Sequence, residues 1–155
     1  MNTNIATTKG QSDRLLRCGV PADTADMSIR TITEPMIKDI AEWETPLLLT
    51  MPYSSAKDIY RGDYIEPVWS LSALLELLPF KIHSGKYEYW LDIAPMDYGR
   101  QWSIGYYCTE KPRVIKGLTH TDSLIECAVQ EIEWLTSNGY NLNDCPCQKK
   151  GGKEQ

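Results

Sequence analysis

The sequence lacks the features that mark membrane, secreted and nucleic-acid-binding proteins. No run approaches the roughly 18–20 consecutive apolar residues that a membrane-spanning helix needs, and residues 1–14 contain no apolar stretch typical of a secretion signal. Positive charge is scarce, because 16 Lys and Arg stand against 21 Asp and Glu, for a formal net charge of −5. These absences predict a cytoplasmic protein with no membrane segment, and they argue against nucleic acid as a partner.

Short catalytic and cofactor-binding motifs are also absent. The sequence contains no Walker loop, no G-x-G-x-x-G, no H-E-x-x-H and no G-x-S-x-G. The five cysteines are an odd number in a chain without an export signal, which predicts reduced thiols. Only Cys145 and Cys147 have a metal-like spacing, and a structural zinc site normally needs two such pairs. The sequence therefore predicts a non-enzymatic protein with no catalytic residues, cofactor or metal.

The aromatic composition is unusual, with five Trp and nine Tyr against a single Phe. Trp and Tyr combine an apolar ring with a polar tip, so they suit half-buried positions and interfaces. The apolar content of 42% is sufficient for a core. We expect one α+β domain over residues 12–142, between a flexible N-terminal arm (1–11) and a polar C-terminal tail (143–155).

The first half of the chain has weak patterns. "SDRLLRCG" predicts a short helix that Ser12 caps and Gly19 ends. "TPLLLTM" predicts a short buried strand, and "SSAKDIYRGDYIEP" is typical of a loop.

The second half has clearer periods. "WSLSALLELLP" predicts a helix with Ser70 as its N-cap and Pro79 beyond its end. "KYEYWLDIAP" and "WSIGYYC" alternate with period two and predict strands joined by a hairpin loop, and "RVIKGL" predicts a third strand. With the helix that follows, residues 70–139 have the order α-β-β-β-α. This order predicts an antiparallel sheet of three or more strands with helices on one face.

The segment "HTDSLIECAVQEIEWLTSNGY" has two readings. His120, Asp122, Ser123 and Cys127 are close in sequence and resemble a catalytic cluster, but adjacent residues at a strand-to-helix junction rarely point at one another. Ser123 and Glu126 have the spacing of a capping box. We therefore read the cluster as the start of a helix. Its apolar arc contains Leu124, Ile125, Ala128, Val129, Ile132 and Leu135.

Four residues form the candidate binding set. Cys127 and Trp134 lie seven apart, outside the apolar arc of the last helix, so Trp134 needs a second contact. The first half of this chain is the favoured source of that contact, ahead of a symmetry mate or a partner. Trp90 and Tyr107 point to the outer sheet side, where Gly105 leaves room for a ring. Either residues 1–66 cover that side, which we favour, or it is a binding platform for protein or stacked bases.

The order α-β-β-β-α over residues 70–139 resembles the double-stranded-RNA-binding fold, which HicB-like antitoxins share in part. Double-stranded-RNA binders place lysines on the phosphates at the start of the last helix. Residues 121–139 contain no Lys or Arg, but they contain Asp122, Glu126, Glu131 and Glu133. This charge argues against RNA binding.

Three segments, "NTNIATTKGQSDRLLRCGVPADTADM", "WSLSALLELLP" and "DSLIECAVQEIEWLTSNGYNLN", resemble small hypothetical proteins of phages and prophages of gut bacteria. The resemblance spans most of the chain in the same order. It implies a mobile-element origin and a cytoplasmic setting, and it assigns no activity and no catalytic residue.

The main functional hypothesis is a phage-associated accessory protein that binds another protein or itself. The alternative is a nucleic-acid-binding or antitoxin-like regulator, and a third is an enzyme whose site residues are distant in sequence. The nucleic-acid alternative requires a basic face around the strands. That face would contain Lys81, Lys86, Arg100, Arg113 and Lys116.

Overall fold

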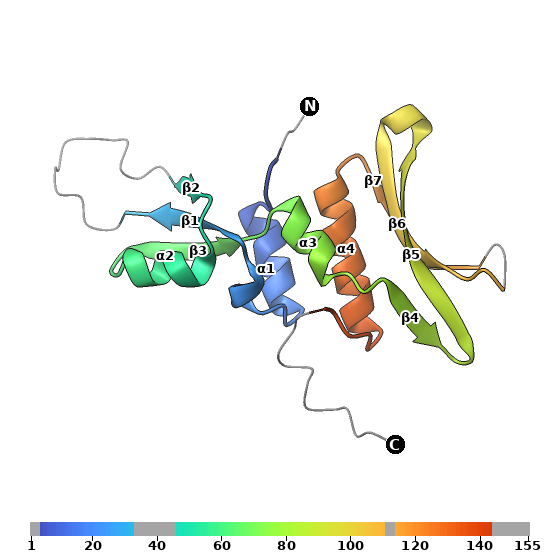
Figure 1. Ribbon diagram of the computed structural model, residues 1–155. Coiled ribbons are helices and arrows are strands. Elements are labelled where there is room, and N and C mark those ends of the chain that lie inside the picture. The colour runs from blue at the N-terminus through green and yellow to red at the C-terminus, as the bar shows by residue number, and fades with distance from the viewer. Residues whose placement is uncertain (1–3, 33–45, 111–113, 144–155) are drawn as a thin grey trace, which may run out of the picture.

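The computed structural model describes residues 4–32, 46–110 and 114–143 of the chain. In these ranges the chain forms four α-helices and two antiparallel sheets, one of three strands and one of four. Figure 1 shows three layers, with helices between the larger sheet on one side and the smaller sheet on the other. The predicted α+β class with an antiparallel sheet is confirmed.

The elements follow one another along the chain as separate groups. The helices are α1 (Lys9–Arg17), α2 (Tyr53–Ile59), α3 (Leu71–Leu77) and α4 (Leu124–Ser137), with 3-10 turns η1 (Ala22–Thr24) and η3 (Asp97–Gly99). The smaller sheet has the order β2-β1-β3, with β1 (Met27–Thr31), β2 (Leu47–Leu49) and β3 (Tyr64–Val68). The larger sheet has the order β4-β5-β6-β7, with β4 (Lys81–Ser84), β5 (Tyr87–Met96), β6 (Gln101–Tyr107) and β7 (Ile115–Thr121).

The larger sheet has one strand more than the predicted order, so residues 70–139 fold as α-β-β-β-β-α. The added strand, β4, pairs with β5 from Lys81 opposite Trp90 to Ser84 opposite Tyr87. It has only four residues and one buried side chain, Ile82, so its pattern is too short to recognise in the sequence. The η3 loop joins β5 to β6, as the sequence predicts.

Helix α4 lies on the inner face of the larger sheet, and α1 and α3 pack on the other side of α4 (Figure 1). Ser123 is its N-cap, with the Oγ accepting a hydrogen bond from the backbone N–H of Glu126 at 3.3 Å. Asn138 ends the helix, and Gly139 follows with a φ of 77°. The predicted start and end of this helix are confirmed. The prediction that the Glu126 carboxylate completes a capping box is wrong.

The Glu126 carboxylate bonds α1 instead. It accepts hydrogen bonds from Arg14 Nη1 at 2.8 Å and from Gln11 Nε2 at 2.6 Å, and Arg14 Nε reaches Glu133 Oε1 at 2.9 Å. Burial alone would raise the pKa of Glu126, but hydrogen bonds from Gln11, Arg14 and Gln130 outweigh it and hold that pKa below its usual value. Two of the acids expected on the surface of this helix therefore fasten α1 to α4.

The first half of the chain differs most from its predicted structure. Helix α1 begins at Lys9 with Thr8 as N-cap in a capping box with Gln11, so Ser12 is not the cap but a buried residue inside the helix. The predicted loop after Pro52 is helix α2 followed by strand β3. The predicted buried strand at Leu47–Leu49 forms as β2, but it is an edge strand with exposed side chains.

The N-terminal arm is ordered over much of its expected length. Ala6 forms a β-bridge with Ser70, and the backbone N–H of Thr7 donates to the Trp69 carbonyl oxygen at 2.9 Å. Trp69 is fully buried, and its Nε1 donates to Thr24 Oγ1 at 2.9 Å. These bonds tie the start of the chain to its middle. Of the expected C-terminal tail, only Asn143 lies in the described residues.

A β-bulge in β7 lies where the sheet approaches α4 closely. The register between β6 and β7 shifts between Ile104 and Tyr106, opposite Gly117. Gly117 has a φ of 63°, and a Cβ there would lie 2.5 Å from Glu131 Oε1 and 2.5 Å from Trp134 Cε3. A glycine is therefore required at this position by the backbone conformation and by the close approach of α4.

Gly117→Ala should lower the free energy of unfolding by roughly 3 kcal/mol, because it adds a steric overlap to the cost of a left-handed alanine. Gly85→Ala is the matched control, since Gly85 has the same φ of 63° and a Cβ there would meet no atom within 4 Å. The control should lose only about 1 kcal/mol. Urea denaturation of the two variants measures the difference in the free energy of unfolding. Equal decreases would show that the side chains of α4 do not pack closely against Gly117.

Candidate functional site

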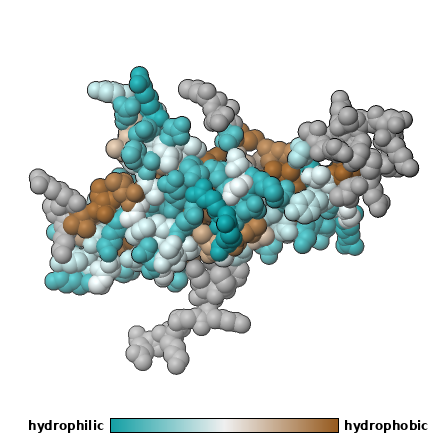
Figure 2. All heavy atoms as spheres, turned by 180° about the vertical axis from the view of Figure 1, so that it is seen from behind, coloured by the Kyte–Doolittle hydropathy of each residue, from teal (hydrophilic) through white to brown (hydrophobic). Residues whose placement is uncertain are grey.

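Several exposed apolar side chains of the second half lie together on the larger sheet, on the side away from the helices. Lys81, Trp90, Tyr107 and Ile115 stand opposite one another in a row across all four strands. Trp90 is 42% exposed, Tyr107 41%, Ile115 50% and Leu118 57%. We define the outer sheet face as these residues together with Asp92 and Gly105. In Figure 2, one of several hydrophobic patches lies on the side of the molecule where this sheet lies.

No element in the described residues covers the outer sheet face. Helix α4 lies on the inner face, α1 and α3 pack on α4, and the smaller sheet lies with α2 on the far side of these helices (Figure 1). The expectation that residues 1–66 cover the face is therefore wrong for the described part of that segment. The sheet has one covered side and one open side, as antiparallel sheets often do.

Gly105 is a part of this face, but its role differs from the expected one. A Cβ at Gly105 would lie 3.0 Å from Ile115 Cγ2 and 3.4 Å from Leu118 Cδ1. Side chains of β7 are therefore the nearest neighbours of Gly105. Ile115 and Leu118 were missed in the sequence, because the bulge at Gly117 breaks the alternation that would have placed both on one side.

The outer sheet face has two charged residues, Lys81 and Asp92. Lys81 Nζ bonds Glu88 Oε1 at 2.9 Å and lies 5.2 Å from the centre of the Trp90 ring. The exposed Asp92 side chain has no hydrogen bond or ion pair with any described residue. Because Glu88 neutralises Lys81, the carboxylate of Asp92 is the one uncompensated charge among the residues of this face.

The two candidates on α4 do not belong to this face. Cys127 is fully buried, and its Sγ donates to the Trp102 carbonyl oxygen at 3.1 Å. Trp134 is half-buried, stacks on Tyr140 with ring centres 5.5 Å apart, and lies beside Gly117. The expectation that Cys127 lies off the packed side of the helix is wrong, and Trp134 takes its cover from the second half of the chain. The positions of Cys127 and Trp134 were mispredicted for the same reason. Helix α4 is packed on two sides, so more of its circumference is buried than its apolar residues indicate.

The possible catalytic cluster does not assemble. His120 is exposed and stands opposite Ser103 on the outer side of the sheet, whereas Cys127 is buried on the inner side. Ser123 caps α4, and the Thr121 hydroxyl is bonded to the backbone of Ser123. These side chains therefore do not converge on a reacting atom.

Glu131 is the most perturbed ionisable group in the described residues. It is fully buried between α4 and β7, and neither carboxyl oxygen has a hydrogen-bond partner. Burial raises its pKa to about 8. The nearby Thr119 hydroxyl offsets this shift in part, but it points at the carbonyl oxygens of Ile104 and Cys127 and forms no hydrogen bond with the carboxyl group. Glu131 therefore lies in the contact between α4 and the sheet without access to solvent.

The basic side chains of the nucleic-acid alternative do not form one face. Lys81 lies on the outer sheet face, whereas Lys116 is half-buried and donates to Ser84 Oγ at 2.7 Å. Lys86 lies in the β4–β5 turn, and Arg100 lies at the opposite end of the β5–β6 hairpin. Arg113 lies outside the described residues, so the structure does not place it.

Metal, membrane and family comparisons add no site. In residues 4–32, 46–110 and 114–143, no three His, Cys, Asp or Glu side chains are grouped to hold a metal ion, and Cys145 and Cys147 lie outside these ranges. None of the helices in that part of the chain has the length and apolar content needed to cross a bilayer. Comparison with protein-family models, curated proteins and solved structures gives no match. The candidate site therefore depends on geometry alone.

Glu131→Gln should remove a pH dependence of stability. The native carboxyl group keeps its proton up to a pKa of about 8, whereas the unfolded chain releases it near 4.5. The stabilisation is therefore complete below about pH 4.5 and is lost as the pH rises towards 8, by on the order of 3 kcal/mol between pH 5 and 7.5. Denaturation curves across this range should show the slope in the wild-type protein and not in the variant. Glu76→Gln, on the exposed side of α3, should keep the slope, and a wild-type protein of constant stability would contradict the assignment.

Proposed function

We propose that this chain is a protein-binding module whose contact surface is the outer sheet face. The observation that carries the proposal is an open side of a packed sheet on which four large apolar side chains are exposed together. Monomeric soluble proteins rarely leave such contiguous surfaces without a partner. The proposal includes no catalytic step, because His120, Ser123 and Cys127 do not converge on a reacting atom.

The chemistry of the face supports a protein as the partner. Trp and Tyr are enriched in the centres of interfaces, where they bury much area at low entropic cost. Trp90 and Tyr107 stand opposite each other at the centre of the row, and the ion pair of Lys81 with Glu88 lies at its end. This arrangement matches an apolar centre with a polar rim.

Nucleic acid is the weaker candidate for the same face. Two aromatic rings could stack on bases, but binding of a single strand also needs a basic groove that follows the phosphates. The only cation of the face, Lys81, is paired with Glu88, and Asp92 adds a negative charge. The proposed setting, a prophage accessory protein in the cytoplasm, depends on the sequence resemblance alone.

Trp90→Ala should weaken partner binding by roughly 30-fold or more, because it removes the largest ring of the face. The free energy of unfolding should change by less than about 0.5 kcal/mol, because the ring is exposed. The tagged protein captures the partner from a lysate of the source cell, and the affinity of the purified pair is then measured by calorimetry. Analytical ultracentrifugation of the wild-type protein and of Trp90→Ala, each without a partner, shows whether the protein self-associates through this face.

Tyr98→Ala is the matched control, because Tyr98 is fully exposed on the η3 loop and lies outside the outer sheet face. It should leave the affinity unchanged. A partner that binds Trp90→Ala and the wild-type protein equally well would contradict the proposed surface. Enrichment of nucleic acid that leaves at moderate salt would favour the alternative.

A further inference from the structure

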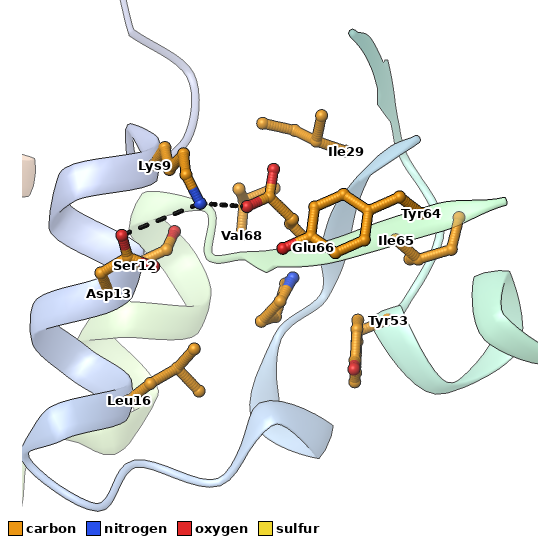
Figure 3. Close-up of a pocket in the computed structure, with 11 residues that line it drawn as sticks. Lys9, Ser12, Asp13, Leu16, Ile29, Tyr53, Tyr64, Ile65, Glu66 and Val68 are labelled. Atoms are coloured by element: carbon orange, nitrogen blue, oxygen red, sulfur yellow. Dashed lines mark hydrogen bonds and ion pairs between the residues drawn. The ribbon is translucent and has the colours of Figure 1, made fainter. Parts of the chain in front are cut away.

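A separate cavity lies at the other end of the molecule, on the far side of the helical layer from the outer sheet face. It has a volume of about 250 Å³ and lies between α1, the smaller sheet and α2. Leu16, Ile29 and Val68 line it with apolar side chains, and Tyr53 and Tyr64 contribute aromatic rings. Figure 3 shows these residues around the hollow, with the charged side chains at one rim. An apolar cavity with a few polar groups on one side is the usual form of a small ligand site.

The charged rim already holds an ammonium group. Lys9 Nζ bonds the Glu66 carboxylate and lies 3.8 Å from Asp13 Oδ2, as the dashed lines of Figure 3 show. The hydrogen bond with Glu66, and then the charge of Glu66, raise the pKa of Lys9. Two carboxylates and one ammonium leave the rim with a net charge of −1. A cation is therefore favoured here over an anion, even though a lysine is present.

Lys9 is a replaceable occupant of this rim. Its side chain is 62% exposed, whereas the Glu66 side chain is 19% exposed. Exposed ion pairs contribute little to stability, so the Lys9 side chain can move away at a small cost in free energy. The carboxylates of Glu66 and Asp13 are then free to bind a ligand. The partly buried Glu66 would then need another cation.

We infer that this cavity binds a primary ammonium group on an aliphatic stem, and that Lys9 is the internal cation which the ligand replaces. The ammonium group takes the place of Lys9 Nζ between Glu66 and Asp13, with the ring of Tyr64 beside it. Charge-assisted hydrogen bonds hold the cation. The stem lies along the apolar wall formed by Leu16, Ile29 and Val68. Such a group occurs on a lysine side chain of another protein and on free polyamines.

Two-dimensional ¹H–¹⁵N NMR titrations of the full chain test this inference with three probes. These are butane-1,4-diamine, Nα-acetyl-lysine N-methylamide and butyrate. The two amines should shift the resonances of Tyr53, Tyr64 and Glu66, and butyrate should not. Equal affinities for the amines would assign the site to any alkyl ammonium, including free polyamines. A preference for the lysine derivative would assign it to a protein lysine.

Lys9→Met gives the sharpest test, because it removes the internal competitor and keeps the length of the side chain. It should tighten amine binding by about two- to fivefold. Glu66→Gln should weaken it by roughly tenfold or more, and Asp13→Asn should act in the same direction. Lys86→Met, in the distant β4–β5 turn, is the control for overall charge and should change nothing.

Three outcomes would overturn the inference. The first is the absence of amine-induced shifts in both the wild-type protein and Lys9→Met. The second is weaker amine binding to Lys9→Met, which would make Lys9 a ligand-binding group. The third is amine binding that persists unchanged in Glu66→Gln, with the dispersed NMR spectrum showing that the variant is folded. Because none of these residues lies on the outer sheet face, loss of partner binding there would not affect this result.

Discussion

The fold depends on helix α4, which is packed on two sides. One side lies on the larger sheet through Cys127, Glu131 and Trp134, and the other meets α1 and α3. Such a helix can serve as the core of a small domain, because it buries apolar surface in both directions. The two faces of the larger sheet are therefore covered unequally. Helix α4 covers the inner face of the sheet and the other described α-helices lie beyond it, so the outer sheet face is left with Trp90 and Tyr107 in solvent.

The contact between α4 and the sheet has an unusual polar element at its centre. Gly117 lets the sheet backbone approach, and the space gained contains the buried carboxyl group of Glu131 and the ring of Trp134. A buried carboxyl group without a partner is costly, so it remains neutral and makes the domain less stable than an apolar side chain of similar size would. Function at this site would need access to solvent, which Glu131 does not have. The contacts that we propose therefore lie elsewhere, on the outer sheet face and at the rim of the cavity.

The sequence predicted most of the second half, because its helices and long strands have strong periods and clear caps. The short strand β4, the bulge at Gly117 and the wide buried arc of α4 were not predictable, since each depends on contacts between distant residues. The first half was predicted poorly, because Thr8 and Gln11 form an N-cap that the apolar pattern does not emphasise. Of the candidate site, Trp90 and Tyr107 were placed correctly on the outer side, whereas Cys127 was not.

We expect the outer sheet face to be uncovered in the free protein. Hydroxyl-radical footprinting of the purified chain at low concentration tests it directly, because oxidation rates follow the solvent access of each aromatic ring. We expect rapid oxidation of Trp90 and Tyr107 and strong protection of the buried Trp69 and Tyr106. If Trp90 and Tyr107 were as protected as Trp69 and Tyr106, the chain would cover its own face, and the proposed binding surface would be wrong.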